Sequence, residues 1–192
     1  MTDFTEFDAD AVFPWLKQAL PLETAPGEPG SEVYEADLPS LDFLGDLRIM
    51  FAIDRDGHYK LLQRHDMPPG MSEAELLALA KKNLGEQVQF DLTGTSYGGY
   101  GILADGDHEA NALCLDFIWD AIAGQIKKDL VVAVPARDCL FMADAADPEQ
   151  IAAMVAIAAD VFANSDRVLT DTLFLFEAES KTFTVYGDLE SV

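Results

Sequence analysis

Positive charge is scarce in this chain of 192 residues. Only 12 lysines and arginines stand against 35 aspartates and glutamates, which gives a formal net charge of −23 at pH 7. An acidic field of this size repels the phosphate backbone of nucleic acids and the anionic surface of membranes. We therefore expect neither nucleic acid nor a membrane as a partner. The charge favours either a protein with a basic surface as partner or a role in solubility alone.

Motifs that bind a metal ion or a cofactor are also missing from the sequence. The two cysteines, Cys114 and Cys139, belong to no CxxC pair and to no other metal-ligand spacing. Both lie in apolar runs, so we expect reduced, buried thiols, with a disulfide as the alternative. The histidines form no HExxH motif, and the glycine-rich segment 94–101 lacks the lysine and the helix of a phosphate-binding loop. We expect no metal and no cofactor.

Long hydrophobic runs are missing as well. No segment approaches the length of about 18 apolar residues that a membrane-spanning helix requires. The N-terminal sequence MTDFTEFDAD is acidic, whereas a signal peptide begins with positive charge followed by a continuous apolar stretch. These absences predict a cytoplasmic protein that does not cross a membrane.

The chain does have enough apolar material for a core, with 49% hydrophobic residues. Apolar residues at helical spacing predict a short helix over 9–20, and the Pro/Gly-rich segment 22–30 predicts a linker. The residues that define the helical spacing are Val12, Trp15, Leu16 and Ala19. We therefore expect an acidic N-terminal helix and linker over 1–30, followed by a single α+β domain over 31–192.

Most of the remaining chain has the patterns of β-hairpins and amphipathic helices. Apolar and polar residues alternate over 47–54, which predicts a strand. Related patterns predict strands over 33–37, 58–64, 88–93, 100–104, 130–134, 139–143, 173–176 and 182–186, and helices over 72–85, 108–126 and 148–162. The predicted fold class is α+β, with a mixed or antiparallel sheet built from β-hairpins and helices packed on it.

The order strand–strand–helix–strand–strand occurs twice, in 47–104 and in 130–186. Two ββαββ pseudo-repeats joined by the helix 108–126 would explain it, and a chance similarity of element order is the alternative.

Two short motifs match known signatures only in part. Residues 94–98 match G-x-S-x-G, but a nucleophile elbow needs a strand-to-helix turn, and here a second strand follows. A hairpin loop fits this segment better. The acidic run 105–109 resembles the start of a calcium loop, but Ala110 and Asp116 stand where that loop needs glycine and glutamate. We expect the run to cap the start of the following helix.

The turn at 135–138 is the strongest candidate for a site. It places Arg137 beside Asp138 between two very apolar strands, and Pro135 fixes the backbone there. We expect Asp138 to accept hydrogen bonds from backbone amides of its own turn and to orient Arg137 or a neighbouring donor. One interpretation is a solvated hairpin turn. The other is an arginine at the rim of a cleft, presenting its planar donor group to a carboxylate.

Four stretches of the chain resemble a known family. They are Lys82-Asn83-Leu84, Asp107-His108-Glu109-Ala110, the segment DLVVAVPARD at 129–138, and the acidic loop and helix that follow. On the basis of these four stretches, the segment 71–186 resembles the YtpQ-like family of uncharacterised bacterial proteins, a domain of unknown function. The resemblance implies a soluble bacterial protein without an assigned activity. The matching positions are Asn83, Glu109, Pro135, Arg137 and Asp138, whereas residues 1–45 find no counterpart.

The sequence favours a non-enzymatic protein-binding or regulatory domain, because no catalytic constellation is recognisable. The alternative is a small-molecule-binding protein or an enzyme with a cleft near Arg137 and Asp138. Glu109 and Asn83 would contribute to such a ligand or partner site.

The helix predicted over 148–162 is apolar on more than one side. Ile157 and Val161 widen its apolar stripe beyond the usual width of about 100°. The stripe itself consists of Ile151, Met154, Val155, Ala158 and Phe162. We expect a second layer over this helix, either another helix or a second subunit in a homodimer.

The charge excess predicts that salt stabilises the fold. Like charges repel one another in a compact state, and mobile ions screen them over about 8 Å at physiological ionic strength. The melting temperature should therefore rise between very low salt and moderate NaCl, as measured by scanning calorimetry at neutral pH. A flat or falling melting temperature over this range would mean that net repulsion contributes little to stability.

Overall fold

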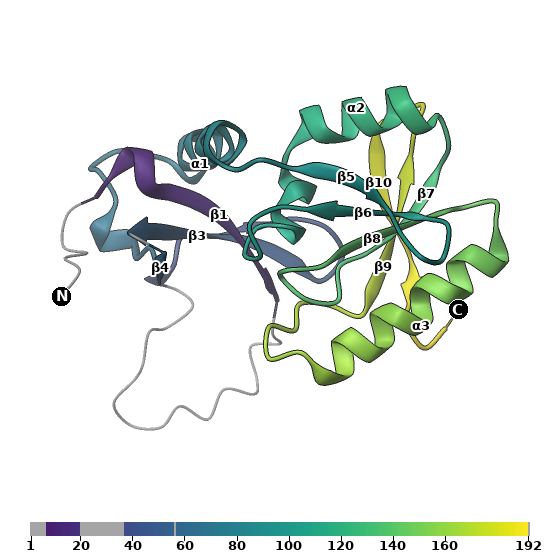
Figure 1. The fold of residues 1–192 in the computed structure, drawn as a ribbon. Helices are drawn as coiled ribbons and strands as arrows, with labels where there is room; N and C mark the ends of the chain where they lie inside the picture. The colour runs from purple at the N-terminus through teal and green to yellow at the C-terminus, as the bar shows by residue number, and fades with distance from the viewer. Residues whose placement is uncertain (1–6, 20–36, 56, 192) are drawn as a thin grey trace. The chain divides into compact units, whose positions relative to one another are not determined.

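The computed structural model describes residues 7–19, 37–55 and 57–191, whose elements divide between two compact units (Figure 1). Unit 1 comprises Met1–Phe43 and Leu47–Gln87, and unit 2 comprises Leu44–Asp46 and Val88–Val192. This division differs from the predicted one at residue 30. The predicted linker 22–30 and all but the last residue of the predicted strand 33–37 lie outside the described residues.

Unit 1 is a small antiparallel sheet with one α-helix. Strand β3 pairs with β1 along one edge and with β2 and β4 along the other, and helix α1 packs against β1. The elements are η1 (Ala9–Ala11), β1 (Val12–Gln18), β2 (Leu41–Asp42), β3 (Leu47–Arg55), β4 (His58–Leu61), η3 (Arg64–Asp66) and α1 (Glu73–Gln87).

The helix predicted over 9–20 is wrong, because the chain forms strand β1 there. Proline inside a helix removes a hydrogen bond and clashes with the preceding turn, and Pro14 occupies such a position. In a strand, proline is tolerated at an edge, and β1 is an edge strand that, among the described residues, pairs only with β3. Residues 12–16 are all buried, so both faces of the strand are covered. A strand buried on both faces has a continuous apolar run that periodicity does not separate from a helix.

Helix α1 begins at Glu73, one residue after the predicted start at residue 72. The Ser72 hydroxyl accepts a hydrogen bond from the Glu75 amide at 3.3 Å, and the Glu75 carboxylate accepts one from the Ser72 amide at 2.8 Å. This reciprocal pair is a capping box. The helix continues to Gln87, two residues beyond the predicted end at residue 85.

Unit 2 is a six-stranded antiparallel sheet between two helices. The strand order is β10-β9-β7-β8-β6-β5, and Figure 1 shows α2 and α3 on opposite sides of these strands. The elements are β5 (Asp91–Gly94), β6 (Tyr100–Leu103), η4 (Ala110–Cys114), α2 (Asp116–Ile126), β7 (Leu130–Ala133), β8 (Leu140–Asp144), α3 (Pro148–Asn164), β9 (Thr172–Glu177) and β10 (Thr182–Asp188). The predicted α+β class, with helices packed on β-hairpins, is confirmed.

The two faces of this sheet have different cores. On one face, α3 packs against apolar side chains of β7, β8 and β9. On the other face, the Trp119 ring of α2 contacts Phe176 of β9 and Phe183 of β10, with ring centroids 4.9 and 4.6 Å apart. Such tilted and edge-on ring contacts add to the stabilisation from apolar burial.

The helix predicted over 108–126 is shorter than expected. Its first part is the 3-10 helix η4, and Leu115 then takes an extended conformation with φ −106° and ψ 97° before α2 begins. At this break the Ala112 carbonyl accepts two hydrogen bonds, from the Leu115 amide at 3.1 Å and from the Trp119 indole N–H at 3.0 Å.

The order strand–strand–helix–strand–strand does occur twice in the structure. The two copies pair differently, however. The first hairpin of the first copy, β3–β4, lies in the sheet of unit 1, whereas its second hairpin, β5–β6, lies in the sheet of unit 2. Both hairpins of the second copy share one sheet. The similarity is therefore one of element order and not of topology.

Helix α3 covers the sheet with the predicted apolar stripe. Ile151, Met154, Val155 and Ala158 are buried, and Val161 is half-buried. Ile157 lies outside the stripe with 37% of its surface exposed. The second layer over this residue stays a prediction. No helix in the described ranges is both long and apolar enough to span a membrane.

Three residues from the N-terminal half of the chain complete unit 2. Leu44–Asp46 lies between β2 and β3 in the sequence yet belongs to unit 2. The Thr170 hydroxyl donates to the Asp46 carboxylate, whose oxygens are 2.8 and 2.9 Å away. Thr170 is buried, so this hydrogen bond satisfies a hydroxyl that water does not reach.

Gly45 at the centre of this segment has a left-handed backbone conformation, with φ +54°, and makes close contacts. A Cβ atom at this position would lie 3.2 Å from the Phe174 ring and 3.3 Å from methyl groups of Thr172 and Val185. Both the backbone angle and the packing therefore require glycine.

Substituting Gly45→Ala should lower the free energy of unfolding by more than Gly70→Ala does. Gly70 also has a positive φ, +85°, but its Cβ would meet no atom within 4 Å. The control variant Gly70→Ala therefore loses only the stability that the left-handed backbone conformation costs, about 1–2 kcal/mol. The variant Gly45→Ala loses a further amount of about 1–3 kcal/mol because its new methyl group overpacks the core. Urea denaturation of both variants measures the difference, and equal losses would show that the contacts at Gly45 are unimportant.

Candidate functional site

The four predicted site residues do not form one site. Asn83 lies in α1 of unit 1, while the other three lie in unit 2. Only 2% of the Asn83 surface is exposed, and its amide donates to the carbonyls of Ala9 and Val12 at 2.7 and 2.9 Å. These bonds tie the helix to the start of β1. The structure therefore gives Asn83 a structural role in unit 1.

Glu109 and Arg137 are brought together by the backbone. The amide of Ala110 donates to the Arg137 carbonyl at 3.0 Å, and the Arg137 amide donates to the Arg167 carbonyl at 3.1 Å. Three distant loops therefore meet, and their residues 105–109, 137–139 and 167 form what we call the arginine cluster. Arg167 was missed in the sequence because nothing near it signals a site.

The Glu109 carboxylate holds a backbone turn together. It is 5% exposed, and its Oε1 accepts hydrogen bonds from the amides of Ala104 and Gly106 at 3.0 and 2.9 Å. Beside it, Nδ1 of the buried His108 ring lies 2.9 Å from Asp105 Oδ2. Partial burial opposes ionisation of Asp105, but the Asp107 amide and the His108 ring more than offset it and lower the pKa of Asp105.

Two arginines lie close together in the cluster. The Arg167 guanidinium donates to the Gly106 carbonyl and to the Asp107 carboxylate, both at 2.7 Å. Burial and the neighbouring Arg167 charge lower the pKa of the half-buried Arg137, and the charges of Asp107 and Asp138 act in the opposite direction. Chemically, two neighbouring guanidinium groups suit a carboxylate or a phosphate.

Asp138 lacks the predicted contacts with backbone amides, but it does contact a neighbouring donor. It is exposed, and no backbone amide of its own turn donates to it within the described chain. The Cys139 amide instead donates to the Ala136 carbonyl at 3.2 Å, so the backbone closes the turn without a side chain. The contact that Asp138 does make is with the Cys139 thiol, whose sulfur lies 3.7 Å from its Oδ1.

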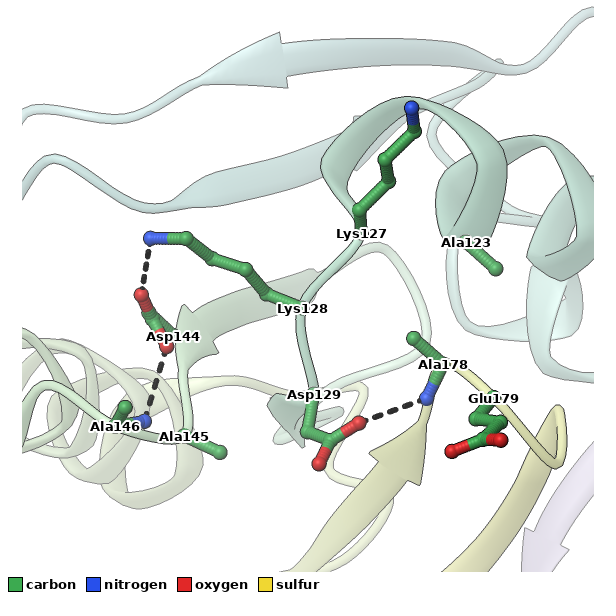
Figure 2. A pocket seen from close by; sticks show the side chains of 9 residues that line it. All are labelled: Ala123, Lys127, Lys128, Asp129, Asp144, Ala145, Ala146, Ala178 and Glu179. Carbon is green, nitrogen blue, oxygen red and sulfur yellow. Dashed lines mark hydrogen bonds and ion pairs between the residues drawn. The ribbon is translucent and has the colours of Figure 1, made fainter.

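A second candidate site is a hollow at one end of the sheet of unit 2. Its volume is about 790 Å³, and it lies where α2 ends, β7 begins, β8 ends and β9 turns into β10. Figure 2 shows the residues that line it, which are Ala123, Lys127, Lys128, Asp129, Asp144, Ala145, Ala146, Ala178 and Glu179. We call it the α2-end hollow.

Two of its carboxylates have fixed orientations. Asp144 forms an ion pair with Lys128, which lowers the pKa of Asp144 and raises that of Lys128, and it also accepts a hydrogen bond from the Ala146 amide at 2.9 Å. Asp129 accepts a hydrogen bond from the Ala178 amide at 2.9 Å. The hollow thus has a rigid acidic wall built by three segments of the chain.

The remaining charges of the hollow are not neutralised. Neither Lys127 nor Glu179 is in an ion pair within the described part of the chain. Lys127 ends α2 with φ +57°, and in Figure 2 its ammonium points away from the carboxylates of Asp129 and Glu179. The side of the hollow that holds these two carboxylates is therefore open to a cation.

Among residues 7–19, 37–55 and 57–191, no group of three or more His, Cys, Asp or Glu side chains is arranged to hold a metal ion. No protein-family model, curated protein or solved structure matches the chain. The YtpQ-like resemblance therefore stays a prediction, and the function is argued from the geometry of unit 2.

Cys139 should react slowly with iodoacetamide in the folded protein at pH 8. Burial, together with the negative charge of Asp138, raises the pKa of Cys139 to about 11, and the thiolate is the reactive form. The alkylation rate, followed by peptide mass spectrometry, should keep rising towards pH 11. Asp138→Asn should move this rise to lower pH, and Asp160→Asn, an exposed change on α3, should not. A rate that already levels off near pH 9 would contradict the raised pKa of Cys139.

Proposed function

We propose that this protein is a non-enzymatic protein-binding domain whose partner presents a basic surface. The observation that carries the proposal is how the chain uses its few cations. Most of its basic side chains already form ion pairs with its own carboxylates. The pairs are Arg48–Asp42, Lys60–Asp66, Arg64–Glu73, Lys82–Glu86, Lys128–Asp144, Arg167–Asp107 and Lys181–Asp120.

The large excess of carboxylates consequently has no counter-charge within the protein. A field of one sign attracts partners of the opposite sign and accelerates their association. It also discriminates against other acidic proteins, because like charges would face each other in the complex. Uncompensated charge of this size therefore supports selection of a basic partner.

The α2-end hollow is a suitable contact point for such a partner. A lysine or arginine side chain could place its cation near Asp129 and Glu179, where the carbonyls at the C-terminus of α2 add negative potential. Its aliphatic stem would contact the alanines of the wall. The fixed Asp129 carboxylate requires little reordering on binding, which favours affinity.

The arginine cluster supports a role other than catalysis. Glu109 uses its carboxylate to hold backbone amides, and Cys139 stays protonated at neutral pH. A nucleophile or a general base needs a pKa matched to the working pH and an orientation towards a substrate. The pKa of Cys139 lies far above neutral pH, and the Glu109 carboxylate is oriented towards backbone amides.

The alternative of a small-molecule site near Arg137 and Asp138 is favoured by one observation, the proximity of Arg137 to Arg167, whose carbonyl accepts a hydrogen bond from the Arg137 amide at 3.1 Å. A ligand bound there would carry a carboxylate or a phosphate. An anionic ligand would be repelled by the excess of carboxylates. A basic protein partner is therefore more consistent with the net charge of the chain.

An oligolysine peptide should bind the protein, and an oligoglutamate peptide of the same length should not. Glu179→Gln should weaken oligolysine binding about two- to fivefold, the effect of one partly exposed charge pair. Glu149→Gln, on the first turn of α3, changes the net charge equally and should leave binding within about the error of the measurement. Calorimetric titrations at two salt concentrations measure both effects, and binding should weaken at higher salt.

Two results would count against the proposal. Equal binding of both peptides would mean that charge does not select the partner. Equal weakening by Glu149→Gln and Glu179→Gln would mean that the hollow is not the contact point. Selection of a basic partner by the acidic field would still be supported in that case.

A further inference from the structure

Strand β10 ends the sheet of unit 2 with a free edge. It pairs with β9 on one side, and no strand of the described chain pairs with its other side. A strand in this position presents a row of backbone N–H and C=O groups without partners in the sheet. Such a row is a template for another strand.

Proteins usually protect such edges, and the opposite edge of this sheet shows how. Strand β5 has only four residues, Asp91–Gly94, and it begins with a charge. Strand β10 has seven residues, Thr182–Asp188, and contains no lysine, arginine or proline. Its protective feature is a register shift between Val185 and Gly187, near its end. The preceding residues of β10 keep a regular ladder with β9.

The side chains of β10 are suited to pairing with another strand. Val185 is 58% exposed and Tyr186 is 41% exposed, although β-branched and aromatic residues form the most favourable cross-strand pairs. The strand is also held rigidly, because Phe183 packs edge-on against Trp119 and beside Phe176. A rigid edge requires little ordering when a partner adds to it.

The charges around the edge specify the kind of strand that fits. Carboxylates flank both ends, with Glu177 and Glu179 before the strand and Asp188 and Glu190 at its end. Lys181 is the basic residue at this hairpin, and it forms an ion pair with Asp120 at 2.8 Å. A second copy of the chain would bring the same carboxylates against these, so charge disfavours a β10–β10 dimer.

We propose that β10 binds an extended segment of the partner protein by β-strand addition, with basic residues at the ends of that segment and β-branched or aromatic residues between them. Backbone hydrogen bonds would supply affinity, and the flanking carboxylates would select the sequence. This inference rests on the proposed binding of a basic partner and adds the surface and the mode of binding.

The test uses the full chain and a synthetic peptide with lysines at both ends and alternating threonine and valine between them. The matched control is the same peptide with alternate backbone nitrogens methylated, which keeps every charge and removes the donors that strand pairing needs. The parent peptide should slow hydrogen exchange of β10 amides and bind at least about tenfold more tightly than the methylated one, as expected when several hydrogen bonds are lost.

Variants of the strand add a second readout. Tyr186→Lys should weaken parent binding more than Tyr186→Thr, because both remove the ring and only the first adds a charge that repels the peptide. Circular dichroism checks that both variants fold. If either does not, the comparison of the two peptides on the wild type decides alone.

The outcomes separate the two proposals. If both peptides bind equally, a basic partner is still supported, but strand addition at β10 is overturned. If neither peptide nor oligolysine binds, both proposals fail. If β10 amides are protected without peptide in a concentration-dependent dimer, a second copy occupies the edge and the inference is overturned.

Discussion

Strand β7 has an apolar side chain at each of its four positions, and all four are almost completely buried. A strand of this kind needs cover on both faces, so the sheet of unit 2 requires a helix on each side. Helix α3 covers the face that holds Val131 and Ala133, while the aromatic contacts of α2 lie on the opposite face. The outer strands then receive less cover, because two helices do not reach across six strands. The exposed side chains of β10 follow from this geometry.

The acidic charge and the exposed edge meet at one hairpin. The turn between β9 and β10 contributes Ala178 and Glu179 to the α2-end hollow, and the residues after it form the free edge. A partner that adds a strand to β10 therefore approaches the same turn whose carboxylate faces the hollow. The hollow and the edge can be two parts of one binding surface, with charge recognised at the turn and backbone recognised along the strand.

Local patterns in the sequence were sufficient to predict the type and the position of many elements. The strand predicted over 47–54 matches β3 of unit 1 within one residue, and the helix predicted over 148–162 matches α3 of unit 2 within two. Failures occurred where tertiary contacts decide the structure. Residues 12–16 form a strand that is buried on both faces, and at Leu115 the backbone becomes extended although the apolar pattern continues. The neighbour of Arg137 in the candidate site, Arg167, is thirty residues away, and no local pattern could pair them.

The path of the chain through Leu44–Asp46 has a consequence for inheritance of the two units. Unit 2 takes three residues from between β2 and β3, so no single cut in the chain separates the two units completely. A gene fragment that encodes only Val88–Val192 would lack the glycine that packs on Phe174 and the carboxylate that satisfies Thr170. Recombination that moves one unit without the other would therefore leave a defect in a core. The two units are expected to be transmitted together.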